Sequence, residues 1–356
     1  MVVYLPSLFV YLVHPGQWWV MGILSIGFPF TWLVFILAVC FGFDINKRLG
    51  VAVLLLWVAG MPIMKNVIGL HLPKEFVVKK QPGTLRIVQW NCMHLPGGEA
   101  WKLEGKSERL QAVQYLRKYA PDIVLVQDFT DYAANGVFSN KSLLQDTLGF
   151  RYVYFKPYYA EKLPWGEVKE GVAIFSKLPL VDSGFVQYTR KSYPANISWA
   201  TVRFNHKLLR LATTHFTSMN LNTPPVSPDT LGVVQLQDST VMRIGSIWQK
   251  LRYYQPYHVK QATMLRSFLD SSSAPTITGM DMNSVPSSYV YKLVKGDRQD
   301  AFLAKGFGFG RSYDTRLPNL RIDYLFVHND LQIMQMTQQY MPISDHQLLI
   351  ADVQWK

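Results

Sequence analysis

Five apolar runs in the second two-thirds of the chain each have a polar residue able to contact phosphate or metal at one end. Their lengths and apolar character predict β-strands. The expected strands cover residues 85–89, 122–126, 208–213, 275–279 and 347–355, with the polar ends Trp90-Asn91, Gln127-Asp128, Thr214-His215, Asp281-Met282-Asn283 and Ser344-Asp345-His346. The first four ends follow their strands and the last precedes its strand. If the last strand runs antiparallel to the others, all five ends share one edge, where a metal and a phosphate could meet.

Helical patterns alternate with these strands. Residues 107–119 carry apolar side chains at helical spacing, and Pro121 ends that helix. Residues 198–204 and 208–215 flank a short polar turn and predict a hairpin. Residues 241–269 predict one helix, or two that are broken at Pro256, and residues 219–229 predict a loop. This alternation suits two mixed sheets that pack face to face with helices outside.

The N-terminal part of the chain has the pattern of a membrane protein. Residues 21–43 are almost purely apolar and long enough to cross a bilayer, which needs about 20 residues. Trp18 and Trp19 precede them, where interfacial aromatic residues are expected. After a charged turn, residues 49–64 are apolar again, which predicts a helical hairpin, and residues 2–13 form a candidate third, shorter helix.

These patterns divide the chain into a transmembrane helical region over residues 1–70, a linker over 71–83 and a catalytic-type domain over 84–356. We therefore expect an integral, multi-pass membrane protein, placed in the inner membrane if it is bacterial. Lys47 and Arg48 in the turn favour a cytoplasmic turn and an outward-facing domain, whereas Lys65 and the lysines of the linker favour the reverse. The oligomeric state stays open.

The composition limits the chemical classes of binding partner that the protein favours. The net charge is +12, and residues 1–43 contain no Lys, Arg, Asp or Glu, so the remainder is strongly basic. A basic domain favours anionic partners such as nucleic acid, phosphorylated small molecules or lipid headgroups. The two cysteines, Cys40 and Cys92, predict neither a disulfide framework nor a structural zinc site.

The order of the polar segments resembles the endonuclease/exonuclease/phosphatase superfamily, the DNase-I-like metal-dependent phosphoesterases. The resemblance runs from about Thr84 to Trp355. Its motifs are the five strand ends above, Glu170 before Gly171-Val172-Ala173-Ile174-Phe175-Ser176, and Arg321-Ile322-Asp323-Tyr324. It implies a four-layer α/β sandwich and a hydrolase that cleaves phosphoester bonds with a histidine-activated water and Mg²⁺, or Mn²⁺ in its place.

The resemblance also assigns roles to residues. Asp128, Asp345 and Asn91 offer the hard oxygen ligands that Mg²⁺ prefers. His346 is the expected general base because an imidazole titrates near neutral pH, and Asp323 is expected to hold its tautomer. His215 is expected to pair with Glu170 and to protonate or bind a phosphate oxygen. Asp281 and Asn283 orient the nucleophile and the phosphate. Asn91, Asn283 and His215 form the expected substrate-binding set.

Two departures from the family pattern leave alternatives open. Asp128 stands where the family normally has glutamate, and it is shorter by about 1.5 Å, one carbon–carbon bond. Met280 and Met282 surround Asp281 where the family usually has glycine and an aromatic residue. A membrane-anchored nuclease or phosphodiesterase is the first function. A lipid-headgroup phosphodiesterase or a remodelling enzyme for glycosylphosphatidylinositol-type lipid anchors is the second. A catalytically weakened module that binds phosphate or protein is the third.

Overall fold

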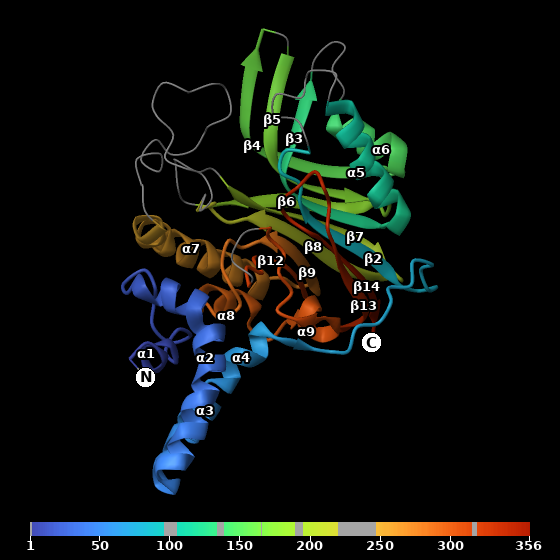
Figure 1. Ribbon diagram of the computed structural model, residues 1–356. Helices are drawn as coiled ribbons and strands as arrows, with labels where there is room; N and C mark the ends of the chain where they lie inside the picture. The colour runs from blue at the N-terminus through green and yellow to red at the C-terminus, as the bar shows by residue number, and fades with distance from the viewer. Residues whose placement is uncertain are drawn as a thin grey trace.

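The architecture is a sandwich of two six-stranded sheets, shown by a computed structural model (Figure 1). The structure describes residues 2–95, 105–133, 139–164, 166–188, 195–219, 247–314 and 319–356. The predicted loop over 219–229 lies outside these ranges beyond Met219, as do residues 241–246 of the predicted helix.

The first sheet has the strand order β13-β14-β2-β3-β5-β4. Its strands are β2 (Leu85–Asn91), β3 (Ile123–Ala133), β4 (Tyr152–Leu163), β5 (Gly166–Ser176), β13 (Leu331–Gln339) and β14 (Leu348–Trp355). β2 and β3 are parallel, whereas β14 is antiparallel to β2. The start of β14 therefore lies at the edge where β2 ends, as the sequence pattern required.

The second sheet has the order β10-β12-β9-β8-β7-β6. Its strands are β6 (Leu180–Gln187), β7 (Asn196–Phe204), β8 (Lys207–His215), β9 (Thr276–Asp281), β10 (Gln299–Asp300) and β12 (Asp323–Val327). β7 and β8 form the predicted hairpin, and β8 runs parallel to β9. A two-stranded ladder, β1 (Gly69–Leu70) with β11 (Phe307–Gly308), lies apart from both sheets.

Three apolar clusters hold the layers together. The inner faces of both sheets bury residues such as Leu125, Ile174, Leu211 and Ile277 between them. Helices α5 (Gly105–Tyr119) and α6 (Asn140–Leu148) cover the outer face of the first sheet. Helices α7 (Ile247–Asp270) and α8 (Tyr289–Lys295) cover the second. The short α9 (Ala301–Lys305) packs against β13 and β12. The four-layer α/β sandwich is thereby confirmed, and α7 continues through Pro256 as one helix.

The N-terminal helices project from the sandwich (Figure 1). They are α1 (Tyr4–Ser7), α2 (Val20–Ile45), α3 (Lys47–Ala59) and α4 (Met61–Val67). Among the described residues, α2 is the only single helix that is long and apolar enough to cross a membrane, with 26 residues. Helices α3 and α4 would form a second candidate span only if the 43° bend between them lies within one span.

The membrane prediction is therefore corrected. One candidate spanning helix lies near the N-terminus, and the multi-pass arrangement is not supported. The apolar run over residues 49–64 does not form one straight helix, because α3 ends before Gly60 and α4 starts at Met61. The candidate third helix over residues 2–13 is α-helical only from Tyr4 to Ser7, with Pro6 inside that stretch, and residues 8–12 form turns.

Candidate active site

Strand register brings the polar ends of the second sheet together. Asp281, the last residue of β9, pairs with His215 on the parallel strand β8 and with Asp323 on the antiparallel strand β12. All three side chains are almost fully buried. In the first sheet Asn91, the last residue of β2, pairs with Gln127. The sequence predicted that this strand ends at Gln127-Asp128, but β3 continues to Ala133, so these two residues lie inside it at a break in its register. The expected common edge thus unites residues that are far apart in sequence.

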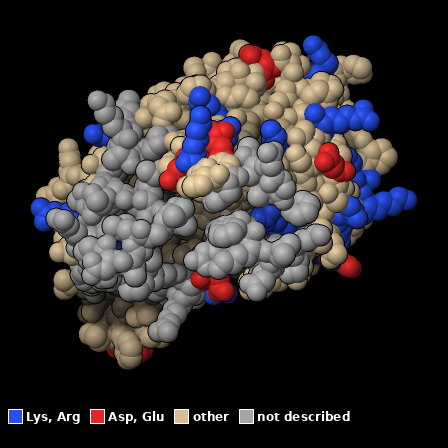
Figure 2. Space-filling model, turned by 90° about the horizontal axis from the view of Figure 1, so that it is seen from above, with Lys and Arg blue, Asp and Glu red and all other residues tan. Residues whose placement is uncertain are grey.

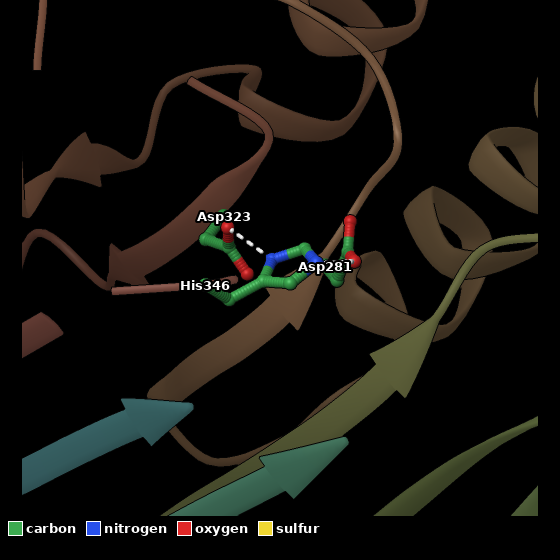
Figure 3. A group of neighbouring side chains, drawn as sticks. All are labelled: Asp281, Asp323 and His346. Carbon is green, nitrogen blue, oxygen red and sulfur yellow. Dashed lines mark hydrogen bonds and ion pairs between the residues drawn. The ribbon is translucent and has the colours of Figure 1, made fainter. Parts of the chain in front are cut away.

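His346 and Asp323 form a buried pair, which Figure 3 shows beside Asp281. The Nδ1 atom of His346 lies 2.8 Å from Oδ2 of Asp323. That carboxylate also accepts hydrogen bonds from Ser312 Oγ (2.8 Å) and from Gln89 Nε2 (3.2 Å). With Nδ1 occupied by Asp323, Nε2 is the ring nitrogen available to the site, and it lies 3.7 Å from Oδ2 of Asp281.

The environment of His346 favours its charged form. Burial opposes the imidazolium, but the negative charges of Asp323 and Asp281 outweigh this and raise the pKa of His346 to about 9. The pKa of Asp323 is raised because its carboxyl group is buried, whereas the nearby imidazoles hold the pKa of Asp281 below its usual value despite burial. The histidine therefore depends on its carboxylate neighbours for its protonation state.

His215 pairs with Asp128, which corrects the expected partnership with Glu170. Its Nδ1 lies 2.8 Å from Oδ1 of Asp128, and its Nε2 lies 3.4 Å from Oδ2 of Asp281. The reason is a break in register of β3 between Val126 and Phe129, where Asp128 adopts a positive φ of 48°. Burial opposes the charged ring, but the two carboxylates raise the pKa of His215 well above its usual value.

Glu170 lies farther from the catalytic edge. It pairs in register with Thr130 on β3, and its carboxylate accepts a hydrogen bond of 3.0 Å from the hydroxyl of Tyr158. The same hydroxyl lies 3.0 Å from Oδ1 of Asp128. Tyr158 therefore links Glu170 to the pair of Asp128 and His215 by hydrogen bonds. Burial raises the pKa of the Glu170 carboxyl.

Two asparagines connect the acidic groups. Asn91 Nδ2 lies 3.0 Å from Oδ2 of Asp281 and 3.3 Å from Oδ2 of Asp128, so it joins the ends of both sheets. Asn283 has a positive φ of 48°, and its backbone N–H donates to Oδ1 of Asp281 at 2.8 Å. Its side-chain amide contacts Nε2 of His215 at 3.1 Å. The strand-end turn after β9 thus brings Asp281 and Asn283 to one site.

The donor set suits a divalent cation. Ligand-type atoms of Asp281, Asp323 and His346 lie within 4.8 Å of one another. Asp323 and His346 are already bonded to each other, so they are better suited to proton transfer than to metal binding. Asp128, Asn91 and the half-exposed Asp345, which the sequence predicts as metal ligands, are not part of this group, and their oxygen atoms are of the kind that Mg²⁺ prefers. Asp345 Oδ1 lies 3.8 Å from His346 Nε2, at the solvent side of the group.

The sequence analysis assigned no role to several polar side chains that support this site, although it included Gln127 among the polar strand ends. Gln127 Nε2 donates to Thr213 Oγ1 on the opposite sheet, and Gln127 Oε1 accepts from Gln89, which also contacts Asp323. His94 lies 3.0 Å from Thr130 and 3.7 Å from Glu170. Two glutamines at the ends of otherwise apolar strands were the available signal, because a buried amide in a strand needs partners.

The fold and the site together define a phosphoesterase-type α/β sandwich. A model of the endonuclease/exonuclease/phosphatase family matches residues 88–346, so the chain belongs to this family. Comparison with curated proteins finds no match.

Solved structures show the same fold at low sequence identity. A family protein from Bacteroides thetaiotaomicron is 13% identical with a TM-score of 0.53, covering 78% of this chain and 100% of that one. The human Nocturnin catalytic domain, solved with a bound sulfate anion, is 17% identical with a TM-score of 0.52, covering 77% and 94%. A family protein from Beutenbergia cavernae is 18% identical with a TM-score of 0.52, covering 76% and 72%.

Proposed function

We propose that this protein is a membrane-anchored hydrolase that cleaves phosphoester bonds with the help of a divalent metal, Mg²⁺ or Mn²⁺. The observation that carries the proposal is the buried His346–Asp323 pair, whose free Nε2 faces Asp281. A histidine with one nitrogen fixed by a carboxylate and the other open to the site is suited to taking a proton from water.

Each residue has a distinct part in this proposal. His346 accepts the proton of the attacking water at Nε2, and Asp323 stabilises the resulting imidazolium through Nδ1. Asp281 orients that water, and Asn283 and Asn91 donate to phosphate oxygens. His215, held by Asp128, is the cationic group for a phosphate oxygen or for the leaving group. Glu170 supports Asp128 through Tyr158.

Asp128, Asn91 and Asp345 would hold the cation. A divalent cation bound there would neutralise the negative charge that develops on the phosphate in the transition state. The fit rests on the donors themselves. Asn91 Nδ2 lies 3.3 Å from Oδ2 of Asp128, so an amide and a carboxylate group meet beside the end of β2.

The N-terminal region supplies the proposed anchor. We propose that residues 1–70 attach the protein to a membrane, that residues 71–83 connect them to the rest, and that residues 84–356 carry the chemistry. The support is α2, on which Val34, Leu37 and Phe41 are 64%, 58% and 65% exposed. Such a surface is costly in water and favourable in lipid.

The substrate is a phosphodiester. The helical hairpin of α2 and α3, as the proposed anchor, favours a lipid headgroup as a second candidate beside nucleic acid. A tethered site meets lipid headgroups at high effective concentration. A nuclease would be expected to have a continuous basic groove. On the face in Figure 2, the described Lys and Arg side chains are dispersed, with acidic groups among them, and do not form one continuous field.

The deciding experiment measures hydrolysis of bis-p-nitrophenyl phosphate by the full chain in detergent with Mg²⁺, Mn²⁺ or EDTA. His346→Ala should abolish metal-dependent turnover. His328→Ala, which removes a partly exposed histidine in the turn after β12, should leave it unchanged. Absence of turnover with either metal in a folded protein would contradict the general phosphodiesterase. Turnover of phospholipid vesicles but not of DNA or RNA would select the lipid substrate.

A further inference from the structure

The N-terminal helices contact the loop that follows Asp281 and Asn283. The hydroxyl of Tyr11 donates to the carbonyl of Pro286 at 2.6 Å, and Ser287 Oγ donates to the carbonyl of Ser25 in α2 at 2.5 Å. Tyr11, Ser25 and Ser287 are all buried. The loop therefore has two hydrogen-bond links to a segment more than 260 positions away in sequence.

A second loop, which leads into Asp323, is held in the same way. Asn319 Nδ2 donates to the carbonyl of Ile26 at 3.0 Å. The fully buried Arg321 donates through Nη2 to the carbonyl of Asn66 at 2.6 Å and through Nη1 to Asp300 at 2.6 Å. Asn66 lies in the last turn of α4, where carbonyls lack intrahelical partners and the helix dipole is negative.

The two loops are also joined to each other beside the catalytic groups. The backbone N–H of Met282 donates to the carbonyl of Ile322 at 2.9 Å, so the residues next to Asp281 and Asp323 are linked directly. A shift of either loop would therefore move a carboxylate against His346. Catalysis is sensitive to such shifts, since about 1 Å of misplacement can cost on the order of a hundredfold in rate.

We propose that the N-terminal helical segment is a positioning element of the active site as well as an anchor. Through Tyr11, Ser25, Ile26 and Asn66 it fixes the 284–288 and 319–321 loops and thereby the geometry of Asp281, Asn283 and Asp323. The structural part of this proposal stands on these contacts alone. Its effect on turnover rests on the function proposed above.

The chain offers a closely matched pair of variants. The test variant Tyr11→Phe/Ser287→Ala removes both side-chain hydrogen bonds between the segment and the first loop. The control variant Tyr4→Phe/Ser7→Ala makes the same substitutions inside the segment, where Tyr4 donates to the carbonyl of Leu56 and Ser7 to that of Tyr4. All four side chains are buried, so the chemical change is the same.

The first readout is amide hydrogen exchange of the full chain in detergent, measured on peptides that cover 282–288 and 319–323. Each lost hydrogen bond is worth roughly a fivefold change in an equilibrium. We therefore expect exchange in the 282–288 peptides to rise by about tenfold or more in the test variant and to stay unchanged in the control. The second readout is steady-state hydrolysis, where kcat should fall by about tenfold or more with KM nearly unchanged in the test variant only.

Unchanged exchange at 282–288 in the test variant would overturn the proposal, and so would an equal rise in both variants, because that would reflect a general loss of stability. Raised exchange confined to the test variant, together with a lower kcat, supports it. If the unmodified protein hydrolyses nothing, raised exchange confined to the test variant still supports the positioning role, and it is the proposed function that fails. Raised exchange with unchanged kcat in an active enzyme would overturn the link to catalysis.

Discussion

The Nδ1 atom of His215 lies 2.8 Å from Oδ1 of Asp128, a residue that the sequence had marked as a shortened metal ligand. The aspartate also accepts hydrogen bonds from Tyr158 and Asn91, so three neighbours surround one carboxylate. The positive charge of His215 holds the pKa of Asp128 well below its usual range, against the effect of burial. Asp128 therefore has two functions to serve, as a proposed cation ligand and as the counter-ion of His215.

Asp128→Asn should affect both functions. The substitution removes one of the two negative charges beside His215, so the pKa of that imidazole should fall and its cationic form should be less populated at a given pH. We expect kcat/KM to fall by about a hundredfold or more, in line with the loss of a buried charge pair. Weaker Mn²⁺ binding, followed by electron paramagnetic resonance, would report the ligand function separately. Asp182→Asn on the exposed strand β6 is the control, and equal losses in both variants would contradict the assignment.

Asp323→Asn should shift the pH dependence of hydrolysis. As a general base His346 must be neutral, and its pKa of about 9 predicts a rate that rises with pH, reaches half its maximum near pH 9 and levels only above that. The negative charge of Asp323 raises that pKa. Its removal should therefore move the rising part of the pH–rate profile toward lower pH. The plateau rate should fall by about a thousandfold, because the imidazole loses its fixed tautomer.

Ser312→Ala is the matched control for that experiment, because it removes a hydrogen bond to Asp323 but keeps the carboxylate charge. The rising part of its pH–rate profile should stay within a few tenths of a unit of the unmodified protein. If the rising part of the pH–rate profile of Asp323→Asn stays at the pH of the unmodified protein, a group other than His346 determines the profile.

The sequence predicted which strand ends meet at the candidate site better than it predicted the side-chain contacts within that site. The strand ends with Asn91, Asp281 and His346 were predictable, because strand periodicity and the antiparallel last strand determine where such ends meet. That His215 pairs with Asp128 and not with Glu170 could not be predicted from the sequence. It depends on a local change of register and a positive φ in β3, neither of which leaves a signal in residue pattern.

The pattern of apolar and polar residues also did not predict the contacts between segments that are distant in the sequence. Tyr11 and Pro286 are 275 positions apart, and nothing in either neighbourhood indicates the other. The apolar run over 49–64 has the composition of one helix, yet it divides at Gly60, because Pro62 has no backbone N–H to bond the carbonyl of Val58 and its ring crowds that carbonyl.

Histidine 258 should make the folded state sensitive to acid. Its ring is fully buried between Thr217 and Ser284, with Nε2 lying 2.7 Å from the carbonyl of Thr217 and Nδ1 3.3 Å from Ser284 Oγ. Burial lowers the pKa of His258 to about 4. The unfolded chain takes up this proton near pH 6.5, so the stability that His258 contributes is full above about pH 6.5 and is lost as pH falls toward 4.

The expected loss over that interval is about 3 kcal/mol, since each unit of pKa difference corresponds to about 1.4 kcal/mol. Chemical denaturation of the unmodified protein and of His258→Gln at a series of pH values measures it. The variant should be less stable at pH 7, and the difference between the two proteins should shrink as the pH approaches 4. A difference that is independent of pH would contradict a neutral, buried His258.

A single charge on the projecting hairpin should weaken the proposed membrane attachment. Leu37 lies on α2 and is 58% exposed, so Leu37→Arg would place a guanidinium where lipid is expected. An arginine at the centre of a spanning helix costs about 3 kcal/mol on insertion scales, and attachment to vesicles, measured by flotation, should fall markedly. Leu208→Arg makes the same change at a 43% exposed position on β8 and should leave flotation unchanged. Equal flotation of all three proteins would argue against α2 as the anchor, whereas a loss confined to Leu37→Arg would place the membrane at the hairpin rather than at the sandwich.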